Sequence, residues 1–113
     1  MRVNKWLTEK LKKLPPIELN GQLFELNGCV YVSILAYYTG ERKYDVNTTT
    51  FLLINLDTFG RWKNPSPLGV LIEDFIEYEF NYLGRTENLA NMTLAFPKDL
   101  SLIEEYHKQD QDI

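Results

Sequence analysis

Three acidic residues lie close together in a segment with helical periodicity, and carboxylates at that spacing can bind cations or a basic surface. Glu73, Asp74 and Glu77 fall on the outward face of a helix that we expect after residue 66. Glu73 and Glu77 are one helical turn apart, so their charges repel each other unless a basic group neutralises them. Glu104 and Glu105 extend the acidic character into the C-terminal segment.

This acidic surface has three interpretations. It can be a solvated face that keeps the protein in solution. It can imitate the phosphates of a nucleic acid and occupy a basic groove on another protein. It can also hold a metal ion, but the spacing does not match an EF-hand and the pattern defines no complete set of oxygen ligands. We therefore expect no metal and no cofactor.

One loop places a tryptophan between two cations, Arg61-Trp62-Lys63. Such a tryptophan can stack on a base while the cations contact phosphates, or act as a hot spot for protein binding. It can also fold back over the edge of the core. Arg42 and Lys43 form a second basic loop, which would join the first if the strands that they flank are neighbours.

Glu79 is expected to be a buried polar anchor. On a helical wheel it falls at about 20° from Leu68, in the middle of the apolar stripe. A buried carboxylate needs a partner, because an unpaired buried charge is costly. The structural interpretation is a salt bridge to Arg61 or Arg85, or a position near the sheet edge where the carboxylate reaches water. The functional interpretation is an anchor in a pocket for a ligand or a partner.

The sequence contains no recognisable catalytic motif. Cys29 and His107 are the only residues of their types, and neither lies in a nucleophile motif. A P-loop, a dinucleotide fingerprint and a zinc-binding pattern are also missing from the sequence. We predict no catalytic residues and a protein that is not an enzyme.

The two halves of the chain carry opposite charge. Residues 1–63 contain nine Lys and Arg against six Asp and Glu, and residues 64–113 contain three against ten. The net charge of the whole chain is −4. Such an asymmetry is typical of proteins that bind a polyionic partner, or a larger protein that presents one.

Length and composition indicate one compact domain over residues 1–113, with a polar C-terminal tail from about residue 108. The length of 113 residues lies within the usual domain size of about 100–150. The single cysteine favours a reducing compartment, and no segment is long and apolar enough to span a membrane. We expect a cytoplasmic protein, and its residue usage has the character of an AT-rich bacterial genome or its phage.

Local patterns predict most of the elements. Asn4 can cap a helix that ends at about Leu14, before Pro15-Pro16. Asn20-Gly21 and Asn27-Gly28 each favour a tight strand reversal. Strands are expected at residues 22–26, 29–38, 48–56 and 92–96, a long helix from a Ser66 cap to a Gly84 cap, and a last helix from a Ser101-x-x-Glu104 capping box.

These elements predict an α+β fold: a small antiparallel β-meander of three or four strands, one long helix packed on a face, and short N- and C-terminal helices. The strand at residues 29–38 is apolar on both faces. We expect the face that carries Val30, Val32 and Ile34 to meet the core, and the N-terminal helix or a partner to cover the other face.

Small size, an acidic half and abundant aromatic residues favour a binding protein. Our first hypothesis is a non-enzymatic interaction protein that docks on the basic surface of a larger, nucleic-acid-handling protein, as an inhibitor or an accessory subunit. In that case the protein would contact nucleic acid only through its complex with the larger protein. The alternative is a nucleic-acid-binding module that uses the basic-aromatic loops, against which the net negative charge counts. A third hypothesis, a small-molecule-binding domain, rests on Glu79 and the tyrosines. The oligomeric state is left open.

Overall fold

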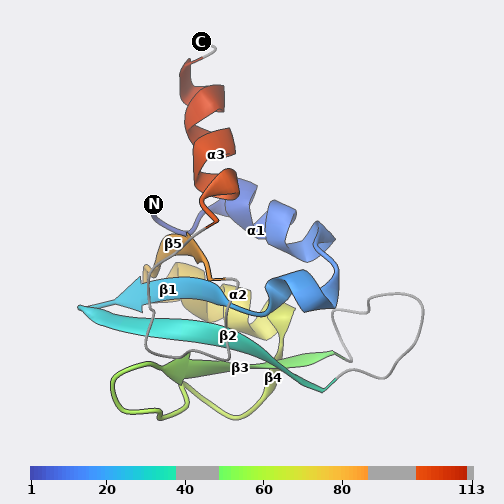
Figure 1. Cartoon of the computed structure of the whole chain (residues 1–113), viewed down its shortest axis with the longest axis vertical. Helices are drawn as coiled ribbons and strands as arrows, with labels where there is room; N and C mark the ends of the chain where they lie inside the picture. The colour runs from blue at the N-terminus through green and yellow to red at the C-terminus, as the bar shows by residue number, and fades with distance from the viewer. Residues whose placement is uncertain (38–48, 87–98, 112–113) are drawn as a thin grey trace.

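The computed structural model describes residues 1–37, 49–86 and 99–111 and has an α+β fold (Figure 1). Its elements in chain order are α1 (Lys5–Lys13), the 3-10 helix η1 (Pro16–Leu19), β1 (Gln22–Leu26), β2 (Cys29–Tyr37), β3 (Thr50–Asn55), β4 (Ser66–Pro67), α2 (Leu68–Glu77), β5 (Asn81–Arg85) and α3 (Ser101–Gln111). The predicted strand at residues 92–96 lies outside the described residues.

The sheet confirms the predicted antiparallel meander but has five strands among the described residues instead of three or four. The strand order is β4-β3-β2-β1-β5, and each neighbouring pair is antiparallel. Strands β1 to β4 follow one another across the sheet. Strand β5 returns to the opposite edge and pairs with β1, which brings the segment after α2 beside the start of the sheet (Figure 1).

The N-terminal helix forms as predicted. The Asn4 side chain accepts a hydrogen bond from the Leu7 backbone N–H at 2.9 Å, which satisfies one of the free donors of the first turn. Leu7 and Leu11 are fully buried on the predicted stripe. The helix ends at Lys13, before the Pro15-Pro16 pair.

The two Asn-Gly pairs behave differently. Asn27 and Gly28 both have positive φ, 52° and 83°, and they close the β1–β2 hairpin as predicted. The prediction for Asn20-Gly21 was wrong, because this pair joins η1 to β1 and reverses no strand. Gly21 is instead a point of close approach: a Cβ there would lie 2.3 Å from the Thr86 carbonyl oxygen.

The long central helix was predicted too long. α2 ends at Glu77, and Gly84 lies within β5 rather than at a helix end. The cause is a Schellman motif with Glu79 in its left-handed position, at φ 60°. Phe80 N–H donates to the Phe75 carbonyl and Glu79 N–H to the Ile76 carbonyl, and the Phe75 and Phe80 rings pack edge to face at 5.3 Å.

The start of α2 also differs from the prediction. Ser66 belongs to β4, and its hydroxyl donates to the Asn64 carbonyl at 2.7 Å instead of capping the helix. Pro67 is the residue before the first helical turn, and no side chain caps this end. The helix therefore owes its position to packing, since Leu68, Leu71, Ile72 and Phe75 are all buried.

The core lies between the helices and one face of the sheet, with α2 behind the sheet in Figure 1. The register pairs Phe24 with Tyr31 and Phe51 with Leu35, so Tyr31 and Leu35 lie on the core face of β2. The predicted core face of β2 was therefore wrong. Val32 is nevertheless buried, on the opposite face, where its cross-strand partner is the equally buried Leu23.

The last helix stands away from the body of the molecule (Figure 1). Its first turns contact α1 and β5, and Leu102 and Ile103 pack against the core. Trp6 of α1 lies 5.3 Å from Tyr106, and Lys10 pairs with Glu105 at 2.8 Å. The helix runs to Gln111, so most of the polar segment from about residue 108 is helical.

None of the helices in the described part of the chain is long and apolar enough to cross a membrane.

Candidate functional site

The outer face of α2, defined here as Val70, Glu73, Ile76 and Glu77, combines acidic and aliphatic side chains. All four residues are exposed to solvent, and the relative exposure of Ile76 is 50%. The helix itself carries three acidic residues and no Lys or Arg. Among the described residues, neither Glu73 nor Glu77 forms an ion pair within 4 Å. Val70 and Ile76 are among the exposed large hydrophobic residues of the described part of the chain, and here they lie beside two exposed carboxylates.

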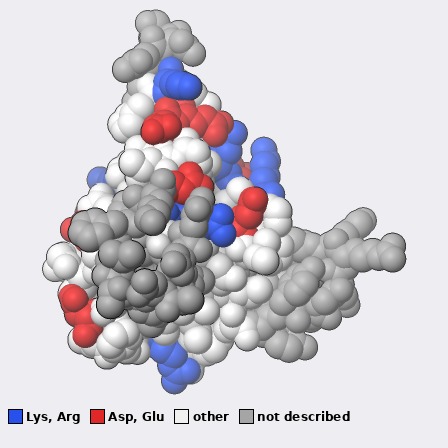
Figure 2. Space-filling model, viewed as in Figure 1, with Lys and Arg blue, Asp and Glu red and all other residues white. Residues whose placement is uncertain are grey.

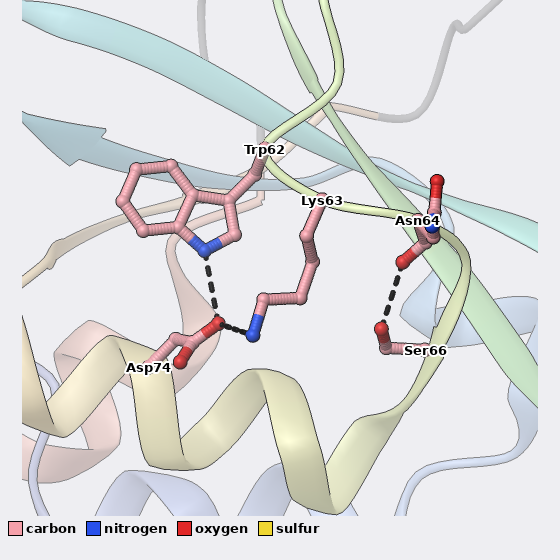
Figure 3. Close-up of polar contacts among 5 residues, drawn as sticks. All are labelled: Trp62, Lys63, Asn64, Ser66 and Asp74. Atoms are coloured by element: carbon pink, nitrogen blue, oxygen red, sulfur yellow. Dashed lines mark hydrogen bonds and ion pairs between the residues drawn. The ribbon is translucent and has the colours of Figure 1, made fainter.

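Asp74 was predicted to lie on that outward face, and this prediction was wrong. Its residue exposure is 8%, and its Oδ2 atom accepts hydrogen bonds from Trp62 Nε1 at 2.9 Å and from Lys63 Nζ at 2.6 Å (Figure 3). We call these three residues the Asp74 cluster. Helix periodicity places Asp74 at the edge of the apolar stripe, and the loop before β4 supplies the donors that make its burial tolerable.

The Asp74 cluster neutralises charge within the protein. The hydrogen bond to Asp74 raises the pKa of the Lys63 ammonium above its ordinary value, and the charges of Asp74 and Glu77 act in the same direction. With Lys63 held on Asp74, the acidic charge that α2 presents outward comes from Glu73 and Glu77.

Trp62 folds back over the edge of the core, which is the third of the three interpretations given for its loop. Its ring is half-buried and packs edge to face against Tyr31, Tyr78 and Phe80, with centroid distances between 5.2 and 5.9 Å. The exposed aromatic residue of this loop is Phe59, at 62% exposure and with φ 60°. Trp62 therefore has its ring and its N–H engaged inside the protein.

Of the other basic residues in the two predicted loops, the structure describes only Arg61. Arg61 is exposed and forms an isolated bridge with Ile54 of β3. Arg42 and Lys43 lie outside the described residues. The structure thus brings Trp62 and Lys63 together on Asp74 and does not test a joint basic surface with residues 42 and 43.

Glu79 is not a buried anchor. Its side chain is 63% exposed and pairs with the Arg2 guanidinium, not with Arg61 or Arg85. The prediction failed because it extended the helical wheel past the true end of α2. Glu79 occupies the left-handed residue of the Schellman motif, where the side chain points away from the core.

The acidic residues of α3 lie among basic ones. Figure 2 shows acidic and basic side chains interleaved over α3 and the neighbouring α1. Glu104 and Glu105 are both exposed, but Glu105 is the ion-pair partner of Lys10. The C-terminal segment therefore presents mixed charge on this side of the molecule, whereas α2 lies behind the sheet in the same view.

A second polar site escaped the sequence analysis. A recess of about 180 Å³ lies where the end of α1, η1, β1, β5 and the start of α3 meet. Leu14 and Leu102 form its apolar walls, and six polar residues complete the lining: Glu18, Gln22, Tyr82, Arg85, Asp99 and Ser101. We call it the polar recess. Its members are dispersed along the chain. The pairing of β5 with β1 brings Tyr82 and Arg85 to Gln22, and a backbone bridge between Arg85 and Asp99 adds the start of α3.

The polar recess contains an ordered hydrogen-bond chain. The Tyr82 hydroxyl donates to Gln22 Oε1 at 2.6 Å, and Gln22 Nε2 donates to the Glu18 carbonyl at 2.8 Å. Burial, together with the charge of Asp99, holds the pKa of Tyr82 well above its ordinary value, while Arg85 opposes the shift. The phenol therefore stays protonated and keeps its role as the donor.

No metal site or nucleophile is assembled in the described part of the chain. No group of three or more His, Cys, Asp and Glu side chains there could hold a metal ion. Cys29 is half-buried at the start of β2, and His107 is exposed on α3.

Comparison of the chain with protein-family models, with curated proteins and with solved structures found no match.

Proposed function

We propose that this protein is a non-enzymatic interaction protein that docks through the outer face of α2 on a basic surface of a larger, nucleic-acid-handling protein. The observation that carries the proposal is the exposure of Glu73 and Glu77 beside Val70 and Ile76, with no ion-pair partner for either glutamate among the described residues. A partner that supplies cations and an apolar contact would complement both properties.

The repulsion between Glu73 and Glu77 indicates the chemistry of the partner. Two glutamates one turn apart repel each other by a few tenths of a kcal/mol, and a cationic partner would remove that repulsion. Proteins that bind nucleic acids carry such cationic grooves, because phosphate contacts supply much of their affinity. The acidic helix would occupy the groove in place of phosphates, as an inhibitor or an accessory subunit. The single cysteine favours the reducing environment of the cytoplasm as the place of action.

Support for the alternative, direct nucleic-acid binding through the basic-aromatic loop, is weaker. Stacking on a base requires an accessible tryptophan face, and Trp62 already packs against three aromatic rings. A phosphate contact by Lys63 would compete with its ion pair to Asp74 at 2.6 Å. Arg61 and Lys63 are both exposed, but of the two only Lys63 has an ion-pair partner within 4 Å among the described residues.

The test is affinity capture from the native host with three matched baits. The first bait is the wild type, the second carries Glu73→Gln and Glu77→Gln, and the third carries Glu9→Gln and Asp57→Asn. The third bait has the same change in net charge but alters exposed residues outside α2. Captured proteins are quantified by mass spectrometry at low and high salt, with and without nuclease.

We expect a stoichiometric partner that survives nuclease, falls at least about tenfold with the α2 bait, and is unchanged with the control bait. Its salt dependence should also flatten when the two glutamates are removed. Equal capture by all three baits would contradict the proposal. Loss of every partner after nuclease would favour the alternative, in which Trp62→Ala and Lys63→Ala lower the affinity for a labelled oligonucleotide and the α2 changes raise it.

A further inference from the structure

The polar recess holds a cation whose charge is not cancelled by a direct partner among the described residues. Arg85 Nε donates to the Asn20 carbonyl at 3.0 Å, and its Nη2 donates to the Ile17 carbonyl at 3.4 Å. Both acceptors are neutral main-chain groups, so they orient the guanidinium without neutralising it. A guanidinium has five N–H donors, and these two contacts leave others to bind a ligand.

A carboxylate lies beside this cation because of the backbone pairing. Arg85 and Asp99 form an antiparallel bridge with N–H···O distances of 2.9 and 3.0 Å. Residues paired in this way project their side chains on the same side of the sheet, about 5 Å apart at Cβ. Asp99 is oriented by the Ser101 N–H at 2.9 Å. Hydrogen bonds from Ser101, and then the charge of Arg85, lower the pKa of Asp99, so it is ionised at neutral pH.

The rest of the recess adds a second carboxylate and a fixed neutral wall. Glu18 is exposed and lines the recess from η1. On the buried side, the Tyr82 hydroxyl and the Gln22 amide are held by the hydrogen-bond chain described above, and the phenol oxygen still has acceptor capacity. The recess is partly open to solvent, and its volume of about 180 Å³ has room for one small organic molecule.

We propose that the polar recess binds a small zwitterion of the α-amino-acid class. The ligand carboxylate binds the Arg85 guanidinium, and the ligand ammonium binds the carboxylates of Asp99 and Glu18. A short ligand side chain packs on Leu14 and Leu102. A simple anion would meet two carboxylates and a simple cation would meet the guanidinium, whereas a molecule with both charges satisfies all three groups. This site is independent of the docking surface, since none of its residues belongs to the outer face of α2.

The experiment titrates the isotope-labelled protein with each of the common L-amino acids, up to about 10 mM, and follows its ¹H–¹⁵N spectrum. The Gln22 side-chain amide, the Arg85 Nε–H and the Ser101 N–H are reporters inside the recess. We expect at least one amino acid to shift these signals in a saturable way. Its decarboxylated amine and its deaminated acid should each bind at least about tenfold more weakly, because each lacks one of the two charges.

Three variants assign the binding to the recess. Arg85→Gln and Glu18→Gln should each weaken binding at least about tenfold, while Glu9→Gln, an exposed change outside the recess, should leave it unchanged. Glu18 is exposed, so its variant keeps the test decisive even if Arg85→Gln unfolds. The proposal is overturned if no amino acid shifts the reporters, if the acid or the amine binds as well as the amino acid, or if Glu18→Gln binds like the wild type.

Discussion

A cation lies beside carboxylates in two regions of the molecule, the Asp74 cluster and the polar recess. In the cluster, Lys63 contacts a buried carboxylate directly, and Trp62 donates to the same oxygen. In the recess, Arg85 is held by neutral carbonyls, and Asp99 lies beside it across an isolated backbone bridge. The first arrangement uses its charges to hold a loop on a helix, and the second leaves its charges available in a concave site.

This contrast gives a physical criterion that separates charges needed by the fold from charges available for binding. A charge that is buried and directly paired is needed by the fold, because removal of one partner leaves the other unsatisfied. A charge oriented by neutral groups at a recess, or left unpaired on a convex face, costs the fold little if it is removed. The same criterion separates Asp74 from its neighbours Glu73 and Glu77 on a single helix.

The largest expected effect on stability comes from Gly21→Ala, because this change disturbs the close contact between residue 21 and Thr86 beside the polar recess. The new Cβ would lie 2.3 Å from the Thr86 carbonyl oxygen, next to Arg85, in a residue with φ 83°. We expect a loss of about 3 kcal/mol in the free energy of unfolding, from left-handed strain and a backbone clash together. Urea unfolding followed by circular dichroism measures the loss, and the Arg85 Nε–H signal should shift.

Gly28→Ala is the matched control for this change. Gly28 has the same φ of 83°, but a Cβ there meets nothing within 4 Å. It should cost only the backbone strain, about 1–2 kcal/mol. Equal losses for the two variants would show that β5 can move away from residue 21 without cost, and the close approach would then not support the recess.

What could be predicted from sequence is what local chemistry determines. The Asn4 cap, the Asn27-Gly28 turn and the three strands of the meander each have their cause within a few neighbouring residues. The end of α2 does not, because the Schellman motif here uses Glu79 instead of glycine and is stabilised by the contact of Phe80 with Phe75. The apolar residues of β5 happen to continue the helical spacing of α2, so the sequence pattern does not show where the helix ends.

The two faces of β2 show a different limit. Both are apolar, so the choice of core face depends on which partners the register supplies. Ser33 shares the core face with Tyr31 and Leu35, and its buried hydroxyl donates to the Leu19 carbonyl and accepts from the Gln22 N–H. The polar recess was missed for a related reason. Arg85 meets Gln22 through the pairing of β5 with β1, and Asp99 joins them through its backbone bridge to Arg85; no local pattern indicates either contact.

The Asp74 cluster should show the next largest effect on stability. Asp74→Ala removes the common acceptor of Trp62 and Lys63, and we expect a loss of about 2 kcal/mol in the free energy of unfolding. Asp74→Asn keeps an oxygen for the indole N–H but not the charge for Lys63, so it should cost about half as much. Urea unfolding gives the losses, and the Trp62 indole signal should move more in the alanine variant.

The recess provides the internal control for both variants, since the Gln22 and Arg85 signals should stay in place. If Asp74→Asn costs as much as Asp74→Ala, the ion pair to Lys63 carries the whole interaction and the bond to Trp62 contributes nothing. If neither variant is destabilised, Asp74 is not a structural charge, and the distinction between it and the outer face of α2 fails.

The smallest expected effect belongs to the outer face of α2. Glu73→Gln together with Glu77→Gln removes the repulsion between two carboxylates one turn apart, so the isolated protein should become more stable by about 0.3 kcal/mol at low salt. The gain should disappear at about 1 M salt, where charges more than about 3 Å apart are screened. Urea midpoints at the two salt concentrations measure both effects.

A loss of stability beyond about 1 kcal/mol would mean that the two glutamates stabilise the fold. The proposal that they are available for a cationic partner would then be contradicted. A gain, with weaker capture of the partner by the same variant, would show that this surface sacrifices stability for binding.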